Sequence, residues 1–403
     1  MRTILQPEWI VDGSGAPPLQ QHAVVLEGGR IESVVPVQSL AAQEGDRLVK
    51  LDGATLLPGL INNHVHLVLP GDNSPFFDVN PLSDVTLGLR ALHNAQTSLH
   101  AGVTTVRDCG ARGTIALHVR DALASGQVAG ARVIACGWPI TISGGHTRNF
   151  GGEADGEDAL RAMVRRKISL GADFVKVMAS GGGTPGSLPN HPSYTLAELR
   201  VIVDTAHMLG RRVVAHCICI TAIENAVDAG VDFIEHAMFT TPDQGVQFDA
   251  RVAEKLAKAA IPVTPTMQVF RDLVDLLPPG AERDTWRIRN EGHREVIGKL
   301  HAYGVTLLAG SDAGWRATAF ETFWKELDEL VNSGLTPVQA VQAATGAIAQ
   351  TWGYTDFGLI AAKRSADLVV VEGNLAAGID CLNHVRAVYQ AGRLMLHNAA
   401  IQP

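Results

Sequence analysis

The chain has 403 residues, of which 46% are hydrophobic and 18% charged, so it can bury a large core and is not a disordered protein. Thirty-three lysines and arginines against 41 aspartates and glutamates give a formal net charge of −8, without a long run of like charges, so we expect no nucleic-acid partner. The sequence shows neither an apolar stretch of about 18 residues nor a signal-peptide pattern, so we expect no membrane span and no secretion. The five cysteines are scattered and do not suggest a disulfide framework, which predicts a cytoplasmic protein.

Both ends of the chain show alternating apolar residues around glycine-containing turns. Residues 23–35 alternate around a Gly-Gly turn, and residues 387–396 repeat this pattern around an Ala-Gly turn. With the apolar runs at 50–57 and 367–371, these hairpins predict a small β-sandwich domain built from both termini. We expect residues 1–57 and 356–403 to form the two parts of this small domain, and residues 58–355 to form a larger domain between them.

Between these ends, short β-branched runs follow glycines at regular intervals. Segments with helical spacing of apolar residues come before them, such as Leu160, Val164 and Ile168. This repetition is typical of parallel βα units, and a glycine often ends the helix before the next strand. A doubly wound open sheet is the alternative, but the chain lacks Gly-x-Gly-x-x-Gly after its first strand. The count of expected strands predicts a (β/α)8 TIM barrel; they are 60–66, 103–106, 133–135, 174–178, 213–216, 233–236, 263–267 and 305–308.

Six potential metal ligands come at or near the ends of these strands, where a barrel places its active site. They are His64, His66, Lys176, His216, His236 and Asp312. His64 and His66 point the same way because residues i and i+2 share a face of a strand. Lys176 lies among valines, where an unpaired ammonium is costly, and carbamylation by CO2 would make it an anionic ligand. A single histidine would be structural, and Asp312 could cap a helix, but six such residues at one rim predict a metal centre.

This ordered set resembles the amidohydrolase superfamily of binuclear metal hydrolases. The sequence PGLINNHVH at 58–66 is similar to the family signature, and TTVRD at 104–108 is also typical. Asn62 departs from that signature, which usually has Asp there, so we expect a different hydrogen bond behind the ligands. Three further motifs resemble the branch of prolidase-like dipeptidases, ochratoxin-degrading amidohydrolases and phenylurea hydrolases: SGGH at 143–146, KVMASGG at 176–182 and IEH at 234–236.

The resemblance implies hydrolysis of an amide-type C–N bond by a hydroxide that bridges two divalent metal ions, with Zn²⁺ as the expected metal. The substrate would be an N-acyl amino acid, amide, carbamate, urea or dipeptide. The implied ligands are His64, His66 and Asp312 for one ion, His216 and His236 for the other, and carbamylated Lys176 for both. Asp312 would also act as the general acid/base. The alternatives are a Schiff-base lyase or aldolase that uses Lys176, and a non-catalytic protein with the amidohydrolase fold.

Two further residues are candidate substrate contacts. His146 matches the Gly-Gly-His of this branch and would bind the substrate carbonyl, unless it lies on the surface. Tyr194 matches a tyrosine of the dipeptidases, and it either contacts substrate or packs at a helix start. Cys217 alternates with His216 and is expected in the core. Residues 181–194 contain no Lys or Arg, which favours a fairly apolar small-molecule substrate, and a homo-oligomer is left open.

Overall fold

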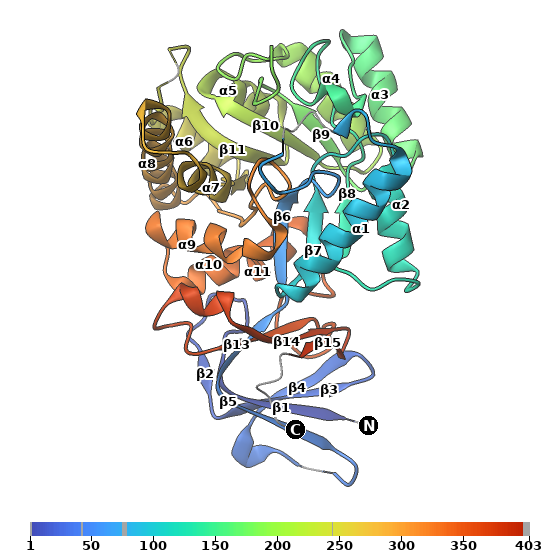
Figure 1. Ribbon diagram of the computed structural model, residues 1–403, viewed down its shortest axis with the longest axis vertical. Coiled ribbons are helices and arrows are strands. Elements are labelled where there is room, and N and C mark those ends of the chain that lie inside the picture. The colour runs from blue at the N-terminus through green and yellow to red at the C-terminus, as the bar shows by residue number, and fades with distance from the viewer. Residues whose placement is uncertain (1, 42, 75–78, 244, 398–403) are drawn as a thin grey trace.

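The computed structural model describes residues 2–41, 43–74, 79–243 and 245–397. A barrel of strands and helices lies above a sheet that contains strands from both ends of the chain (Figure 1). The strands are β1 (Thr3–Ile10), β2 (Leu19–Gln20), β3 (His22–Glu27), β4 (Arg30–Pro36), β5 (Arg47–Pro58), β6 (Leu60–Val65), β7 (Val103–Asp108), β8 (Arg132–Ala135), β9 (Val175–Met178), β10 (Val213–Cys219), β11 (Phe233–Thr240), β12 (Val263–Thr264), β13 (Leu368–Glu372), β14 (Val385–Gln390) and β15 (Arg393–His397).

Helices surround the barrel strands. The α-helices are α1 (Asp84–His100), α2 (Ile115–Ala124), α3 (Glu157–Ser169), α4 (Leu196–Met208), α5 (Ile220–Ala229), α6 (Ala250–Lys258), α7 (Gln268–Leu276), α8 (Ala281–Ala302), α9 (Trp324–Asn332), α10 (Pro337–Ala343) and α11 (Gly346–Trp352). Short 3₁₀ helices lie at Val37–Ser39, Arg148–Phe150, Phe320–Thr322 and Ile379–Asn383. Among the helices of the described residues, none is long and apolar enough to cross a membrane.

The barrel consists of two runs of parallel strands. Strands β6, β7 and β8 pair in that order, and β9 to β12 form the second run. Single parallel bridges close the ring between the runs, and they are Ile140–Val177, Val263–Leu307 and Val65–Ala313. The predicted (β/α)8 barrel is therefore confirmed.

The eighth predicted strand, at 305–308, is not regular. The segment from Val305 to Ala313 joins its neighbours only through single bridges and scattered backbone hydrogen bonds. It cannot stay extended at its end, because Asp312 has a left-handed φ of 59° and its amide donates to the His64 carbonyl at 2.9 Å. A Cβ on Gly310 would lie only 2.8 Å from the backbone nitrogen of His64. This close approach brings Asp312 over the end of β6.

The strands of the two ends form one eight-stranded sheet in the order β15-β14-β13-β5-β1-β3-β4, with β2 paired to β1. The long strand β5 joins the two ends, because it pairs in parallel with β1 and antiparallel with β13. In Figure 1, β13 to β15 lie between the barrel and strands β1, β3 and β4. A small β domain from both termini is thus observed as a continuous sheet. The division of the chain after residues 57 and 355 stays a prediction.

The main core lies between the barrel strands and the surrounding helices. Leu160 and Val164 on α3 are fully buried in it, as their helical spacing predicts. Cys217 and Cys219 on β10 belong to the same core, as expected for Cys217. All five cysteines are buried and free.

Candidate active site

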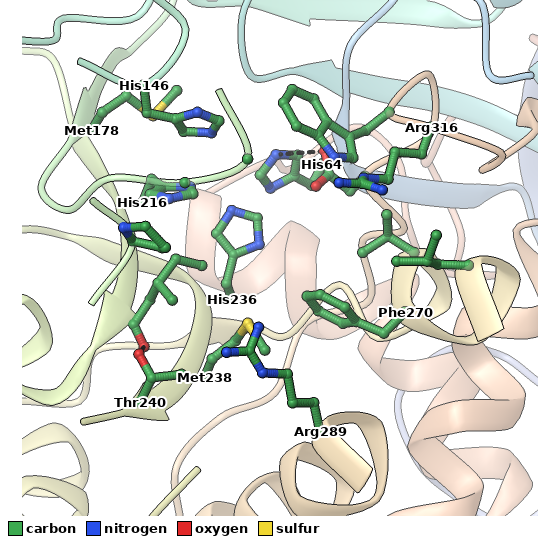
Figure 2. A pocket seen from close by; sticks show the side chains of 18 of the residues that line it. His64, His146, Met178, His216, His236, Met238, Thr240, Phe270, Arg289 and Arg316 are labelled. Atoms are coloured by element: carbon green, nitrogen blue, oxygen red, sulfur yellow. Dashed lines mark hydrogen bonds and ion pairs between the residues drawn. The ribbon is translucent and has the colours of Figure 1, made fainter. Parts of the chain in front are cut away.

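A cavity of about 140 Å³ opens at the carboxyl ends of the barrel strands (Figure 2). The six predicted metal ligands come from five different strand ends and all line it: His64, His66, Lys176, His216, His236 and Asp312. The barrel therefore brings together residues that lie far apart in the sequence, as the strand-end argument predicts.

The first two histidines point their Nε2 atoms at Asp312. Nδ1 of His64 donates to a carboxylate oxygen of Glu235 at 2.5 Å, and Nδ1 of His66 donates to the carbonyl of Gly110 at 2.8 Å. Since these oxygens accept hydrogen bonds, the proton of each neutral ring lies on Nδ1 and Nε2 keeps its lone pair. The Nε2 atoms lie 3.4 and 3.3 Å from Oδ1 of Asp312.

The other two histidines are held in the same way. Nε2 of His216 donates to the carbonyl of Gly181 at 3.0 Å, which leaves the lone pair on Nδ1. Nδ1 of His236 is hydrogen-bonded to the Thr266 hydroxyl at 2.7 Å. The two ring centroids are 4.4 Å apart, and that of His236 is 5.1 Å from that of His64. Each of the four rings thus has one nitrogen fixed by the protein and one free to bind a cation, the usual arrangement of histidine metal ligands.

Two buried polar atoms of this cluster make no hydrogen bond with any described residue. Lys176 is 0% exposed and its Nζ has no such partner, and the same holds for Oδ1 of Asp312. A buried ammonium without a partner is costly, and Oδ1 of Asp312 keeps lone pairs free of hydrogen bonds, so both atoms are suited to a bound group. Ligand atoms of His64, His236 and Asp312 lie within 4.8 Å of one another. Nitrogen and carboxylate donors at this spacing fit a divalent metal such as zinc.

The electrostatics of the cluster favour the ligand forms of His64, His216, His236 and Asp312, but not that of His66. Burial and neighbouring positive groups lower the pKa of three imidazoles well below its usual range, and these are His64, His216 and His236. Burial would also lower the pKa of His66, but the Asp312 carboxylate outweighs it and raises that pKa. Burial would raise the pKa of Asp312, but His64, His66 and Lys176 hold it below its usual range. Neutral imidazole and carboxylate are the forms that bind metals.

A buried ion pair supports His64 from behind. Arg107 is 1% exposed and its guanidinium binds Glu235, the residue that accepts the His64 hydrogen bond. Nε of Arg107 also donates to the Asn63 side chain at 3.0 Å. The sequence alone predicts no role for Arg107 or Glu235. The sequence does contain a signal for this ion pair. The TTVRD and IEH motifs each place a charged residue inside a buried strand, where it needs a partner of opposite charge.

Asn62 makes the different hydrogen bond expected behind the ligands. Its Nδ2 donates to the Ser311 hydroxyl at 2.7 Å, and its Oδ1 accepts from the Ser311 amide at 3.0 Å. An aspartate could accept the second bond but could not donate the first. Asn62 therefore ties β6 to the segment that carries Asp312.

His146 lines the cavity and is 6% exposed. Figure 2 shows it beside His216, and the two ring centroids are 4.7 Å apart. The amide of Thr184 donates to Nδ1 of His146 at 3.4 Å, so Nε2 carries the proton. Burial lowers the pKa of His146 to about 3, which keeps the ring neutral. A Cβ on Gly182 would come within 2.5 to 2.8 Å of the ring, so this position needs glycine.

The structure places Tyr194 away from the cavity. Its side chain is 2% exposed, its hydroxyl donates to the Ala154 carbonyl at 3.0 Å, and it is not among the described residues that line the cavity. The next residue, Thr195, forms a capping box with Glu198 at the start of α4. Of the two roles considered for Tyr194, packing at a helix start is the one that the structure supports.

Two arginines that the sequence reasoning missed also line the cavity. Arg289 lies on α8, and Arg316 follows Asp312 in the loop after the eighth barrel segment. Figure 2 shows both side chains reaching toward the cavity on either side of Phe270. Residues 181–194 lack a cation, but cations reach the cavity from other loops. Apolar residues form the wall beside the arginines: Met178, Ile218, Met238, Val269, Phe270, Leu273, Trp286 and Trp315.

The chain is similar to known hydrolases over almost its whole length. Residues 55–395 match the amidohydrolase family. The ochratoxinase of Aspergillus niger is 26% identical over an alignment of 438 residues, which covers 97% of this chain and 86% of that protein. A Xaa-Pro dipeptidase with methionine bound in its active site is 25% identical, with a TM-score of 0.85 over 98% of this chain and 99% of that chain. Phenylurea hydrolase B, 21% identical, has the same fold, with a TM-score of 0.83 over 98% of this chain and 97% of that chain.

These relatives belong to the branch that the motifs predict. The similarity to hydrolases favours a hydrolase over the two alternatives, which were a Schiff-base lyase or aldolase that uses Lys176 and a non-catalytic protein with the same fold. The chain belongs to the amidohydrolase family and is a hydrolase that acts on carbon–nitrogen bonds.

Proposed function

We propose that the chain is a binuclear metal hydrolase that cleaves the amide bond of N-acyl amino acids with a bulky apolar side chain. One observation carries this proposal. A single cavity contains the six metal-ligand candidates together with two arginines and an apolar wall. This combination suits a substrate with a carbonyl to attack, a carboxylate to bind and an apolar group to bury.

The metal ligands divide into two groups around Lys176. His64, His66 and Asp312 would hold one Zn²⁺, and His216 and His236 the other. Reaction of the Lys176 amine with CO2 would form a carbamate N–C bond and release a proton, giving an anionic group with two oxygens that could hold both cations. When bound, two such cations polarise the substrate carbonyl and lower the pKa of a water molecule.

Asp312 and His146 are the proposed catalytic residues. The water oxygen forms a bond to the carbonyl carbon while Asp312 accepts a proton from the water, and Asp312 then returns this proton to the nitrogen as the C–N bond breaks. His146 would donate from Nε2–H to the carbonyl oxygen, where negative charge develops. Its bond to Thr184 supports this role, because it fixes the tautomer that has the proton on Nε2.

We expect His146→Ala to lower kcat by about 10²–10³-fold, the usual effect of losing one oxyanion donor, while the metal content stays unchanged. Gly182→Ala should lower kcat in the same way, because the new Cβ would displace the His146 ring. Gly88→Ala is a matched control, since a Cβ at Gly88 meets no atom within 4 Å. Steady-state kinetics and elemental analysis measure both quantities. Wild-type kcat in His146→Ala would show that this ring does not contact the reacting carbonyl.

The arginines give the proposal its substrate class. The guanidinium carbons of Arg289 and Arg316 lie 5.3 and 5.8 Å from the centroid of the Trp286 ring, so both cations and an aromatic surface lie close together. A guanidinium binds a carboxylate through charge-assisted hydrogen bonds. The similar Xaa-Pro dipeptidase has methionine, an amino acid with a free carboxylate, in its active site. This similarity supports an amino-acid product with an apolar side chain.

We expect Arg289→Met to raise KM for N-acyl amino acids by about 10–100-fold, equivalent to one charge-assisted hydrogen bond, with little change in kcat. The corresponding N-acyl amino acid amides, which lack the carboxylate, should show little change in KM. Arg287→Met is a matched control, because Arg287 lies on the same helix and forms an exposed ion pair with Glu291. An equal KM increase for acids and amides would contradict carboxylate binding by Arg289.

A substrate panel tests the proposed function itself. The enzyme would be loaded with Zn²⁺ in the presence of bicarbonate and offered N-acyl amino acids, dipeptides, carbamates and aryl ureas. We expect the highest kcat/KM for N-acyl derivatives of leucine, methionine or phenylalanine. A urea or carbamate without a carboxylate that is hydrolysed at least about tenfold better than every N-acyl amino acid would contradict the proposal.

A further inference from the structure

Helix α8 reaches the metal-ligand cluster from outside through one buried histidine. His293 is 0% exposed, and its Nε2 donates to the backbone carbonyl of His236 at 2.8 Å. His293 does not line the cavity, and its Nδ1 has no hydrogen-bond partner in the described part of the chain. Its contact with the cluster is therefore the hydrogen bond to the His236 backbone.

The backbone of His236 has a conformation that needs such support. Its φ is 67°, and that of the next residue, Ala237, is 47°. Residues other than glycine rarely adopt this left-handed region, and they keep it only where the surroundings fix them. Thr266, which binds the His236 ring, also has a positive φ, of 55°. The ring is thus held at Nδ1 by a hydroxyl, and the backbone is held at the carbonyl by His293.

His293 is also in contact with the substrate side of the cavity. Its ring packs edge-on against Phe270, with centroids 5.9 Å apart and an interplanar angle of 82°. Phe270 in turn stacks on Trp286 at 6.0 Å. Trp286, Arg289 and His293 lie at helical spacing on one face of α8. The same helix face therefore carries the cavity wall and the support of His236.

We propose that His293 is a positioning residue, whose hydrogen bond to the His236 carbonyl holds the left-handed backbone that directs the His236 ring at the metal centre. This inference rests on the proposed function in one respect, the assignment of His236 as a metal ligand. The proposed role depends on the N–H group of His293 that donates this hydrogen bond. A residue of similar size that has no N–H donor should therefore not replace His293. Glutamine, whose amide nitrogen has a similar reach, should replace it in part.

Zinc affinity of the full-length apoenzyme tests this role without any assay of activity. Zn²⁺ would be titrated in competition with a chromophoric chelator, in the presence of bicarbonate. We expect His293→Phe to weaken binding by about 10–100-fold, as loss of a supporting hydrogen bond around a ligand does, and His293→Gln to bind close to the wild type. His301→Phe, a histidine change near the end of the same helix, is the matched control and should bind like the wild type.

The zinc affinities of these variants and of His236→Ala decide the inference. Wild-type zinc affinity in His293→Phe would overturn it, and so would an equal loss in His293→Phe and His293→Gln, which would show that packing and not the donor matters. If circular dichroism shows that His293→Phe is unfolded, His293→Met takes its place in the same comparison. Wild-type affinity in His236→Ala would overturn the ligand assignment, and this inference with it. A loss in His236→Ala without a loss in His293→Phe would overturn this inference alone.

Discussion

Lys176→Ala is expected to lose most of the bound metal and at least about 10³-fold in kcat/KM, because the metal ions supply several kcal/mol of transition-state stabilisation. Lys176 is fully buried among strand residues, and its Nζ has no hydrogen-bond partner among the described residues. A carbamate on this nitrogen is the group that we propose to join the two cations. Added acetate or propionate should restore part of the metal and activity by occupying the same space.

Elemental analysis and steady-state kinetics, each with and without bicarbonate, measure this effect. Lys167→Met is a matched control, because Lys167 is also fully buried in the barrel. Its Nζ donates to the carbonyls of Cys136 and Trp138, and burial lowers its pKa to about 8. This variant should lose stability but keep its metal. Full metal content and activity in Lys176→Ala would contradict the role of Lys176.

Asp312→Asn is expected to keep the fold and most of the metal but to lower kcat by about 10²–10⁴-fold, the usual contribution of a positioned acid/base. Asparagine tolerates the left-handed φ of 59° at this position and keeps an oxygen that can bind a cation. It cannot accept the proton of the attacking water.

Thermal unfolding, metal content and kcat would be compared for Asp312→Asn and for Asp275→Asn, an exposed change on α7. We expect the control to match the wild type in all three. A kcat close to the wild type in Asp312→Asn would mean that another group moves the proton.

The barrel and the clustering of its candidate ligands were predictable because both depend on patterns that repeat along the chain. Glycines followed by β-branched runs mark the strands, and the ends of parallel strands meet at one rim. The sequence alone therefore predicts that His64, His66 and His216 lie close together at this rim. The eighth segment was not predictable as irregular, because its course depends on the fit of Gly310 against β6.

The substrate side of the cavity could not be predicted because it depends on tertiary packing. Arg289 lies on helix α8 outside the ring of strands. The sequence pattern of this helix does not show that its side chains reach the cavity. Tyr194 matches a motif, yet its hydroxyl is bound to Ala154 on a neighbouring loop. The hydrogen bond from His293 to His236 joins residues far apart in the sequence, which a local pattern does not reveal.

We propose above all that this chain holds a centre of two metal ions joined through Lys176. Zinc content per chain, measured by elemental analysis on fully active wild-type enzyme prepared with bicarbonate, tests it most directly. The six clustered donors predict about two zinc ions per chain, since one tetrahedral zinc would leave donors unused. A constant content of about one zinc per chain at full activity would contradict the claim.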